Sequence, residues 1–206
     1  MIEIRWHGRG GQGAKTAALL LADAAFAAGL YVQGFPEYGP ERMGAPITAY
    51  NRLDENRIRA HSNIYDPDIV VVVDETLLGA VDVAAGLKCG GKIVVNTSRP
   101  PADVKAEFEK FFPDCGNAEI YAVDAAEISR RTLGKNLPNT PLLSVVAKLT
   151  GVLDEQKFFG VMQEAYEEKF AAKPEVIEGN MEALREAWNG AVLVNATHSP
   201  ELTIEN

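Results

Sequence analysis

Cysteine is scarce in this sequence: Cys89 and Cys115 are the only two among 206 residues, and they form no C-x-x-C pair. So few thiols exclude a disulfide-stapled secreted scaffold, and we expect both to stay reduced in a cytoplasmic protein. An iron–sulfur cluster usually takes four cysteine thiolates. We therefore expect this chain to hold no such cluster by itself.

Long apolar runs and an excess of positive charge are missing as well. No run approaches the roughly 18 to 20 apolar residues of a membrane span, and the formal net charge is -9. We therefore expect neither a membrane nor nucleic acid among the partners. Met1 leads directly into the strand-like IEIRWH, so no signal peptide is expected either.

Signals for a metal site or a catalytic nucleophile are also absent. The three histidines have no metal-ligand spacing. No G-x-S-x-G elbow or Cys/His pairing points to a nucleophile. The sequence therefore assigns no catalytic residue and no metal ligand to this chain.

Apolar runs alternate with helical patterns along the chain, as in an α/β domain. The predicted strands cover 2–7, 30–35, 69–74, 92–97 and 119–124, and a hairpin of 47–53 with 57–63 adds an antiparallel pair. The predicted helices cover 13–28, 76–88, 102–111, 125–133, 138–152, 155–170 and 175–189. These patterns predict one three-layer αβα domain over residues 1–190 with a mostly parallel, Rossmann-like mixed sheet, followed by a C-terminal tail at 191–206.

The predicted strand ends bring polar and glycine residues to one place. In open parallel sheets, ligands bind beyond the carboxyl ends of the strands. Those ends are the glycine loop at 8–13, the segment 36–46, Asp74–Glu75, Asn96–Thr97 and Asp124. We expect them to share one edge of the sheet.

The glycine loop, in HGRGGQGAKT (residues 7–16), first suggests a dinucleotide site. Gly8-Arg9-Gly10-Gly11-Gln12-Gly13 satisfies G-x-G-x-x-G between a strand and a helix, where backbone N–H groups face an anion. Such a site also uses an acidic residue at the end of the second strand. That strand ends in Gln33-Gly34 instead, which weakens this interpretation.

Two further interpretations remain for the same loop. Gly8 and Gly13 have the spacing of a phosphate loop, but Ala14 displaces Lys15 and Thr16 by one position, about 100° around the helix. Asp74 resembles the magnesium-binding acid of such proteins only superficially. Alternatively, the glycines only permit close packing of the helix or of another chain.

The segment FPEYGPERMGAP (35–46) carries three prolines and two glycines, which exclude regular structure. Its aromatic and charged residues are typical of contact surfaces. We predict an interface formed by Glu37, Tyr38, Glu41 and Arg42.

With both loops in view, the chain resembles the gamma subunits of the 2-oxoacid:ferredoxin oxidoreductase family, and within it the pyruvate (pyruvate synthase) branch. The matching stretches are GRGGQGAKTAA, YVQGFPEYGPERMGAP, PDIVVVVDETLL, GGKIVVNTS and EGNMEALREAW. Two stretches depart from the family pattern. Met43 stands where members often have a second basic residue, and NTPLLSVVAKL (139–149) replaces a Met-rich stretch, which leaves the oxoacid open among pyruvate, 2-oxoglutarate, branched-chain oxoacids and indolepyruvate.

The resemblance implies an assembly that oxidatively decarboxylates a 2-oxoacid to acyl-CoA and CO₂ and reduces ferredoxin. Its alpha, beta and delta-type subunits would carry thiamine diphosphate, magnesium and 4Fe-4S clusters, while this chain supports assembly and part of the coenzyme A site. The residues that would contact coenzyme A are Gly8, Gly10, Gly11, Gln12, Gly13, Thr16 and Asn96. Packing against a neighbouring subunit is the alternative role of the loop, and a stand-alone nucleotide-binding protein is the alternative function.

Overall fold

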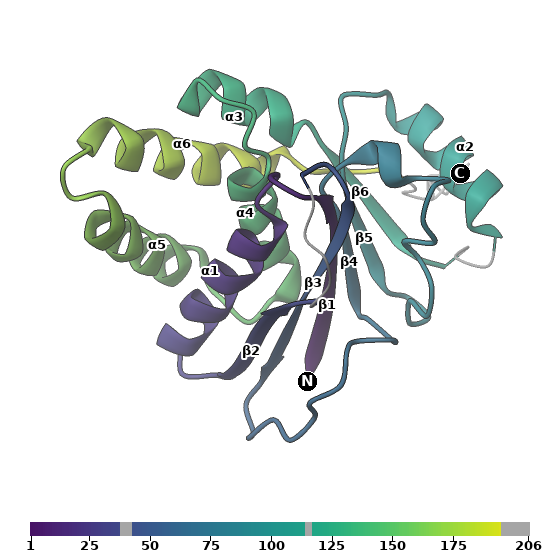
Figure 1. Ribbon diagram of the computed structural model, residues 1–206, viewed down its shortest axis with the longest axis horizontal. Helices are drawn as coiled ribbons and strands as arrows, with labels where there is room; N and C mark the ends of the chain where they lie inside the picture. Colours follow the sequence, from purple (N-terminus) through teal and green to yellow (C-terminus); the bar gives the residue numbers. More distant parts are fainter. Residues whose placement is uncertain (38–42, 114–116, 195–206) are drawn as a thin grey trace, which may run out of the picture.

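A mixed β-sheet forms the middle layer of the molecule (Figure 1). The structure is a computed structural model, and it describes residues 1–37, 43–113 and 117–194. In these residues seven strands form one sheet in the order β2-β3-β1-β4-β5-β6-β7. Their bounds are β1 (Ile2–Arg9), β2 (Tyr31–Pro36), β3 (Pro46–Asp54), β4 (Ile69–Val72), β5 (Lys92–Asn96), β6 (Glu119–Val123) and β7 (Val192–Leu193).

Strand direction confirms the predicted mixed and mostly parallel sheet. β1, β4, β5 and β6 pair in parallel, and β3 is antiparallel to both β1 and β2, so β2 also runs with β1. Only β3 and β7 run the other way among the described strands. The antiparallel hairpin is the β2–β3 pair.

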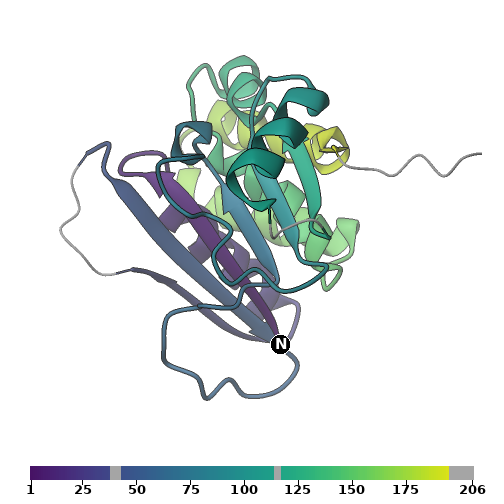
Figure 2. The ribbon, with the colours of Figure 1, turned by 90° about the vertical axis from the view of Figure 1, so that its right-hand side faces the viewer.

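Helices cover the two faces of the sheet unequally. Their bounds are α1 (Ala14–Ala27), α2 (Pro101–Phe111), α3 (Ala125–Leu133), α4 (Asn139–Thr150), α5 (Glu155–Phe170) and α6 (Pro174–Gly190). Figure 1 shows α2 on one side of the sheet and the other helices on the opposite side. In Figure 2, α2 lies over the β5 and β6 end of the sheet, and none of the described helices covers β2 and β3 from that side. The three-layer prediction is confirmed, although the α2 layer covers only part of its face.

The strands in the middle of the sheet are apolar because both of their faces are buried. Val71 and Val94 face the cluster formed with α1 and α4, whereas Val70 and Val95 face α2. All four side chains are fully buried. This is the usual reason for a continuous β-branched run in a parallel sheet.

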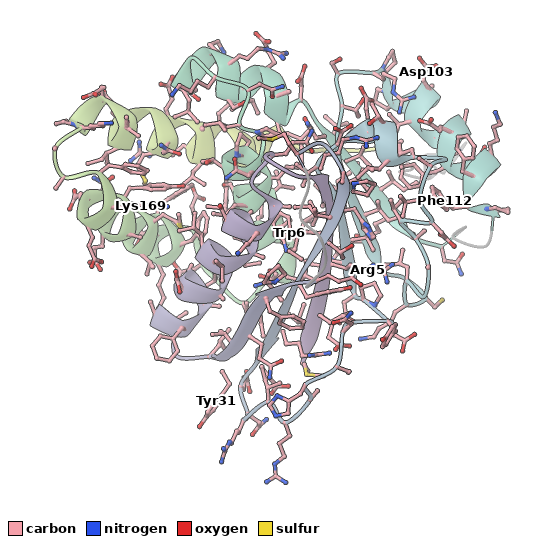
Figure 3. All side chains as sticks on the ribbon, viewed as in Figure 1. Arg5, Trp6, Tyr31, Asp103, Phe112 and Lys169 are labelled. Carbon is pink, nitrogen blue, oxygen red and sulfur yellow. The ribbon has the colours of Figure 1, made fainter. Side chains whose placement is uncertain are left out.

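β1 also places side chains on both faces of the sheet, but these side chains carry polar groups. Trp6 and Arg5 leave opposite faces of the strand (Figure 3). The Trp6 indole Nε1–H donates to Asn51 Oδ1 at 2.8 Å, and the Asn51 Nδ2–H donates to Ala18 O at 2.7 Å. This buried polar chain fixes β1 and β3 against α1.

The predicted hairpin of 47–53 with 57–63 is wrong. β3 pairs with β1 on one side and with β2 on the other, so neither of its edges is left for 57–63. Side chains hold that segment instead: Gln33 Nε2–H donates to Ala60 O at 2.8 Å, and Arg52 donates to Asn63 O at 3.3 Å.

The predicted helix at 76–88 is also wrong, because only a 3₁₀ turn, η1 (Glu75–Leu77), forms there. Gly79 and Gly86 adopt positive φ angles of 78° and 67°, which an α-helix excludes. The buried Arg5 guanidinium donates to Val83 O at 3.1 Å and to Ala85 O at 2.5 Å. These carbonyl groups therefore bond to a side chain instead of to a helical backbone.

The sheet extends past the predicted boundary at residue 190, because β7 pairs with β6 through Ala122–Val192 and Tyr121–Leu193. Among the described residues, no helix is both long and apolar enough to cross a bilayer.

Candidate functional site

The ends of the central strands confirm the predicted shared edge. The glycine loop begins with Gly8 and Arg9, the last two residues of β1, and the Gln12 side chain reaches Asp74 just beyond β4. Asn96 at the end of β5 donates its Nδ2–H to Val73 O at 2.9 Å. The connection after β1 leads to β2 at one end of the sheet, whereas the connection after β4 leads to β5 on the other side. The direction of the connections therefore changes between β1 and β4, and ligands commonly bind at such a position.

Two positions in the loop show why glycine is required there. Gly11 and Gly13 adopt φ angles of 95° and 80°, which side chains of L-residues disfavour. A Cβ on Gly13 would also lie 2.7 Å from Asn139 Cγ, and one on Gly8 would lie 3.2 Å from Ala14 Cβ. Gly8 thus allows α1 to pack closely on β1, and Gly13 allows the close approach of Asn139. A contact between the loop glycines and a ligand stays a prediction.

The N-terminus of α1 is open toward a surface cavity. Gly13 is the N-cap and supplies no side-chain cap, and the first turn carries no acidic residue. The first N–H groups of a helix lack internal partners and carry its positive dipole end, so this end favours an anion. The adjoining cavity of about 390 Å³ is lined by Gly10, Gly11, Gly13, Ala14, Lys15, Thr16, Met43 and Ile47.

The residues that lead into β3 are bound to the glycine loop by backbone hydrogen bonds. Gly10 N–H donates to Ala45 O at 2.9 Å, and Gly44 N–H donates to Gly10 O at 3.1 Å. Met43 is 90% exposed beside this pair. The two loops singled out from the sequence are thus neighbours, as far as the second is described.

Asp74 joins this site from the residues just beyond β4. Its Oδ2 accepts Gln12 Nε2–H at 2.5 Å, and its Oδ1 accepts the backbone N–H and the hydroxyl of Thr76 at 2.9 and 2.6 Å. Arg9 Nε lies 3.4 Å from Oδ2. Burial favours a raised pKa, but the hydrogen bonds from Thr76 and Gln12 and the Arg9 charge lower the pKa of Asp74 below its usual value. A carboxylate bonded in this way does not offer the free oxygens of a magnesium ligand, which weighs against the phosphate-loop interpretation.

Asn96 is tied into the fold through both ends of its amide. Besides the bond to Val73 O, its Oδ1 accepts Ala126 N–H at 3.1 Å in the first turn of α3, whose N-cap is Asp124. Thr97 next to it donates to Glu75 Oε2 at 2.6 Å. A contact between Asn96 and a ligand stays a prediction.

The predicted interface is described only in part. Glu37 is exposed, and its Oε2 accepts the Tyr50 hydroxyl at 3.3 Å. Burial, together with the nearby Glu37 carboxylate, raises the pKa of Tyr50 to about 12. Tyr38, Glu41 and Arg42 lie outside the described residues, so their role in an interface stays a prediction.

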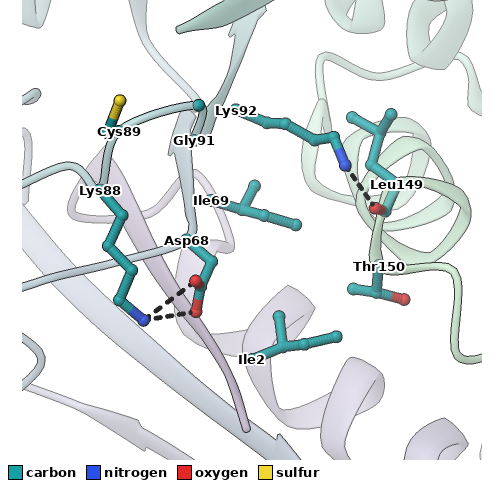
Figure 4. Close-up of a pocket in the computed structure, with 10 residues that line it drawn as sticks. Ile2, Asp68, Ile69, Lys88, Cys89, Gly91, Lys92, Leu149 and Thr150 are labelled. Atoms are coloured by element: carbon teal, nitrogen blue, oxygen red, sulfur yellow. Dashed lines mark hydrogen bonds and ion pairs between the residues drawn. The ribbon is translucent and has the colours of Figure 1, made fainter.

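A second cavity, of about 290 Å³, lies at the opposite edge of the sheet, where β1, β4 and β5 begin (Figure 4). Its two lysines already have partners. Lys88 Nζ lies 2.9 Å from both Asp68 carboxylate oxygens, and Lys92 Nζ donates to Leu149 O at 3.4 Å. The cavity beside the glycine loop, where a helix N-terminus lies open, is therefore the better candidate for an anionic ligand.

Comparison with known proteins gives a consistent result over nearly the whole chain. Residues 3–190 match the family model "Pyruvate ferredoxin/flavodoxin oxidoreductase". The common subunit gamma of the pyruvate/ketoisovalerate oxidoreductases of Thermococcus litoralis is 46% identical over 193 residues, which are 94% of this chain and 98% of that protein. Pyruvate synthase subunit PorC of Methanothermobacter thermautotrophicus is 41% identical over 188 residues, 91% of this chain and 94% of that protein.

A solved structure agrees with these sequence relatives. Pyruvate oxidoreductase subunit PORC from Thermotoga maritima superimposes with a TM-score of 0.76 at 38% identity, covering 93% of this chain and 97% of that one. The family model, the sequence relatives and the fold agree, and this chain belongs to the pyruvate ferredoxin/flavodoxin oxidoreductase family.

Proposed function

We propose that this chain is the gamma-type subunit of an assembly that oxidatively decarboxylates a 2-oxoacid, in the first place pyruvate, to acyl-CoA and CO₂ with reduction of ferredoxin. Alpha, beta and delta-type subunits complete the assembly and carry thiamine diphosphate, magnesium and the 4Fe-4S clusters. Family membership supports this proposal. The two cysteines of this chain agree with the clusters lying on other subunits, because a cluster usually takes four thiolates.

Within that assembly, the glycine loop contributes part of the coenzyme A site. The observation that carries this proposal is the uncapped N-terminus of α1, which opens at Gly13 onto a cavity of about 390 Å³. Coenzyme A is the anionic substrate of the reaction, and its phosphate groups suit backbone N–H donors at a helix N-terminus. Lys15 is exposed on the cavity wall and adds a positive charge, and Thr16 adds a hydroxyl group.

The first experiment is to tag this chain in its native cells and purify it without oxygen. The product is assayed for partner chains, iron and thiamine diphosphate, and for reduction of ferredoxin that depends on both pyruvate and coenzyme A. Replacing pyruvate by 2-oxoglutarate, 2-oxoisovalerate or indolepyruvate identifies the preferred oxoacid. A lone, colourless chain that binds a nucleotide tightly would overturn the proposal.

The coenzyme A role is tested by two glycine variants of the assembled enzyme. Gly11→Ala places a methyl group at the cavity, 2.8 Å from Met43 Sδ, whereas Gly29→Ala lies at the other end of α1 with nothing within 4 Å. Both glycines have similar positive φ angles, 95° and 93°, so the backbone strain is matched. We expect Gly11→Ala alone to raise the KM for coenzyme A, by about tenfold if one backbone contact to a phosphate is lost. An unchanged KM for coenzyme A would indicate that the loop does not contact this substrate and that the chain acts in assembly only.

A further inference from the structure

We propose that Asp74 is the positioning residue of the glycine loop, and that it acts through the side chain of Gln12. Together these residues set the loop in its ligand-ready shape before anything binds. The inference rests on the proposed function of the loop in holding coenzyme A, and it assigns Gln12 to the loop's support and not to direct contact with the ligand.

The Gln12 amide has a defined orientation because both of its ends are bonded. Its Oε1 accepts the backbone N–H of Arg9 at 2.8 Å, so the oxygen end faces the start of the loop. Its Nε2 end therefore faces Asp74 Oδ2 at 2.5 Å and donates to it. The side chain therefore spans the loop from Arg9 to Asp74, just beyond the end of β4.

The Asp74 carboxylate is itself held in a fixed position. It is 14% exposed, and its Oδ1 accepts two hydrogen bonds from Thr76, at the start of η1. Asp74 also lies between the buried strand β4 and η1, for which it is the N-cap, so the backbone on both sides of it is held in regular structure. The loop, in contrast, contains glycines that impose little conformation of their own.

Arg9 extends this support to the residues before β3. Its Nε lies 3.4 Å from Asp74 Oδ2, and its terminal nitrogens donate to Thr76 Oγ1 at 2.9 Å and to Gly44 O at 3.1 Å. The Thr76 hydroxyl donates to Asp74, so it accepts from Arg9. One carboxylate thus organises three segments: the glycine loop, residues 43–46 and η1.

The polarity of the Gln12–Asp74 bond supplies a sharp test. In Asp74→Asn, an amide N–H replaces an acceptor oxygen opposite the Gln12 N–H. In Gln12→Glu, two carboxylates face each other. The double variant restores one donor and one acceptor in reversed order, and it keeps the net charge of the pair. Asp154→Asn is the matched control, because Asp154 caps α5 through Lys157 N–H and lies outside the site.

The first readout is amide hydrogen exchange of residues 10–14 in the assembled enzyme without coenzyme A. We expect each single variant to speed this exchange about tenfold or more, and the double variant to return within about threefold of the unmodified enzyme. Asp154→Asn leaves it unchanged. Unchanged exchange in Asp74→Asn would overturn the inference, and so would a double variant that exchanges as fast as the single ones.

The second readout is the KM for coenzyme A, measured beside kcat and the KM for the oxoacid. We expect Asp74→Asn to raise the KM for coenzyme A alone, by about tenfold, with recovery in the double variant. Recovery also shows that the ligand does not need the Gln12 amide. If exchange at the loop responds but this KM does not, Asp74 still positions the loop, and the proposed coenzyme A role fails by itself.

Discussion

His7, a buried residue of β1, makes the stability of this fold depend on pH between 7 and 5. It is 7% exposed, and its Nε2 accepts the Nε–H of Arg5 at 3.0 Å, so the ring is held neutral. Burial, together with the Arg5 charge, lowers the pKa of His7 from 6.5 to about 3. In the unfolded chain the same ring takes up a proton near pH 6.5. The contribution to stability is therefore fully present above pH 6.5 and is lost progressively as the pH falls toward 3.

The size of the effect follows from the two pKa values. At pH 5 the unfolded ring is protonated and the folded ring is not, and each unit of separation corresponds to about 1.4 kcal/mol. The free energy of unfolding should therefore fall by about 2 kcal/mol between pH 7 and pH 5 because of His7. In His7→Gln, the glutamine Oε1 can accept the Arg5 N–H but does not titrate. Urea unfolding at pH 7, 6 and 5 should show this part of the pH dependence missing from the variant.

The control is His61→Gln, which makes the same substitution at a histidine on the surface of the protein. Its pH profile should follow that of the unmodified chain. Parallel profiles for His7→Gln and the unmodified chain would refute the reasoning. So would a His7 ring signal in nuclear magnetic resonance spectra that titrates near pH 6.5 in the folded protein.

Three further predictions concern stability, each measured by urea unfolding at pH 7. Gly13→Ala should cost roughly 1 to 3 kcal/mol more than Gly151→Ala, because both glycines have positive φ but only the first Cβ meets another residue; equal losses would contradict this. Asn51→Leu should lower stability by roughly 1 to 3 kcal/mol, since it leaves the buried Trp6 N–H unpaired and removes the side-chain hydrogen bond to Ala18 O, and the absence of a measurable loss would refute it. Asn96→Ala should cost roughly 1 to 2 kcal/mol through the lost hydrogen bond to Ala126 N–H in the first turn of α3, with Asn96→Asp recovering part of it; no recovery would show that the bond to Val73 O dominates.

The sequence predicted most of the fold because most of the signal is local. The apolar run at 69–74 marks a strand buried on both faces, and Gly29 marks the end of α1, where its φ is 93°. The pairing partner of 47–53 is not a local property. Both 31–36 and 57–63 have strand-like patterns. In the structure, β1 pairs with one edge of β3 and β2 pairs with the other, which leaves no edge for 57–63.

The candidate site was predictable to the extent that it depends on backbone conformation. Glycines between a strand and a helix indicate a tight loop at a helix N-terminus, and the structure has this geometry. The bond between Gln12 and Asp74 joins residues 62 positions apart, and no spacing rule relates them. Likewise, nothing in the sequence indicates that the oxygen and the nitrogen of the Asn96 amide both form hydrogen bonds with the backbone.

The position of β1 in the middle of the sheet determines when the glycine loop can acquire its shape during synthesis. β1 precedes both of its neighbours in the chain, β3 and β4, which end at residues 54 and 72. The loop depends on Ala45 on one side and on Asp74 on the other. Closing contacts of such separation costs chain entropy before it brings any gain. The shape of the glycine loop is therefore a property of the folded chain as far as Asp74, and not of the loop's own residues alone.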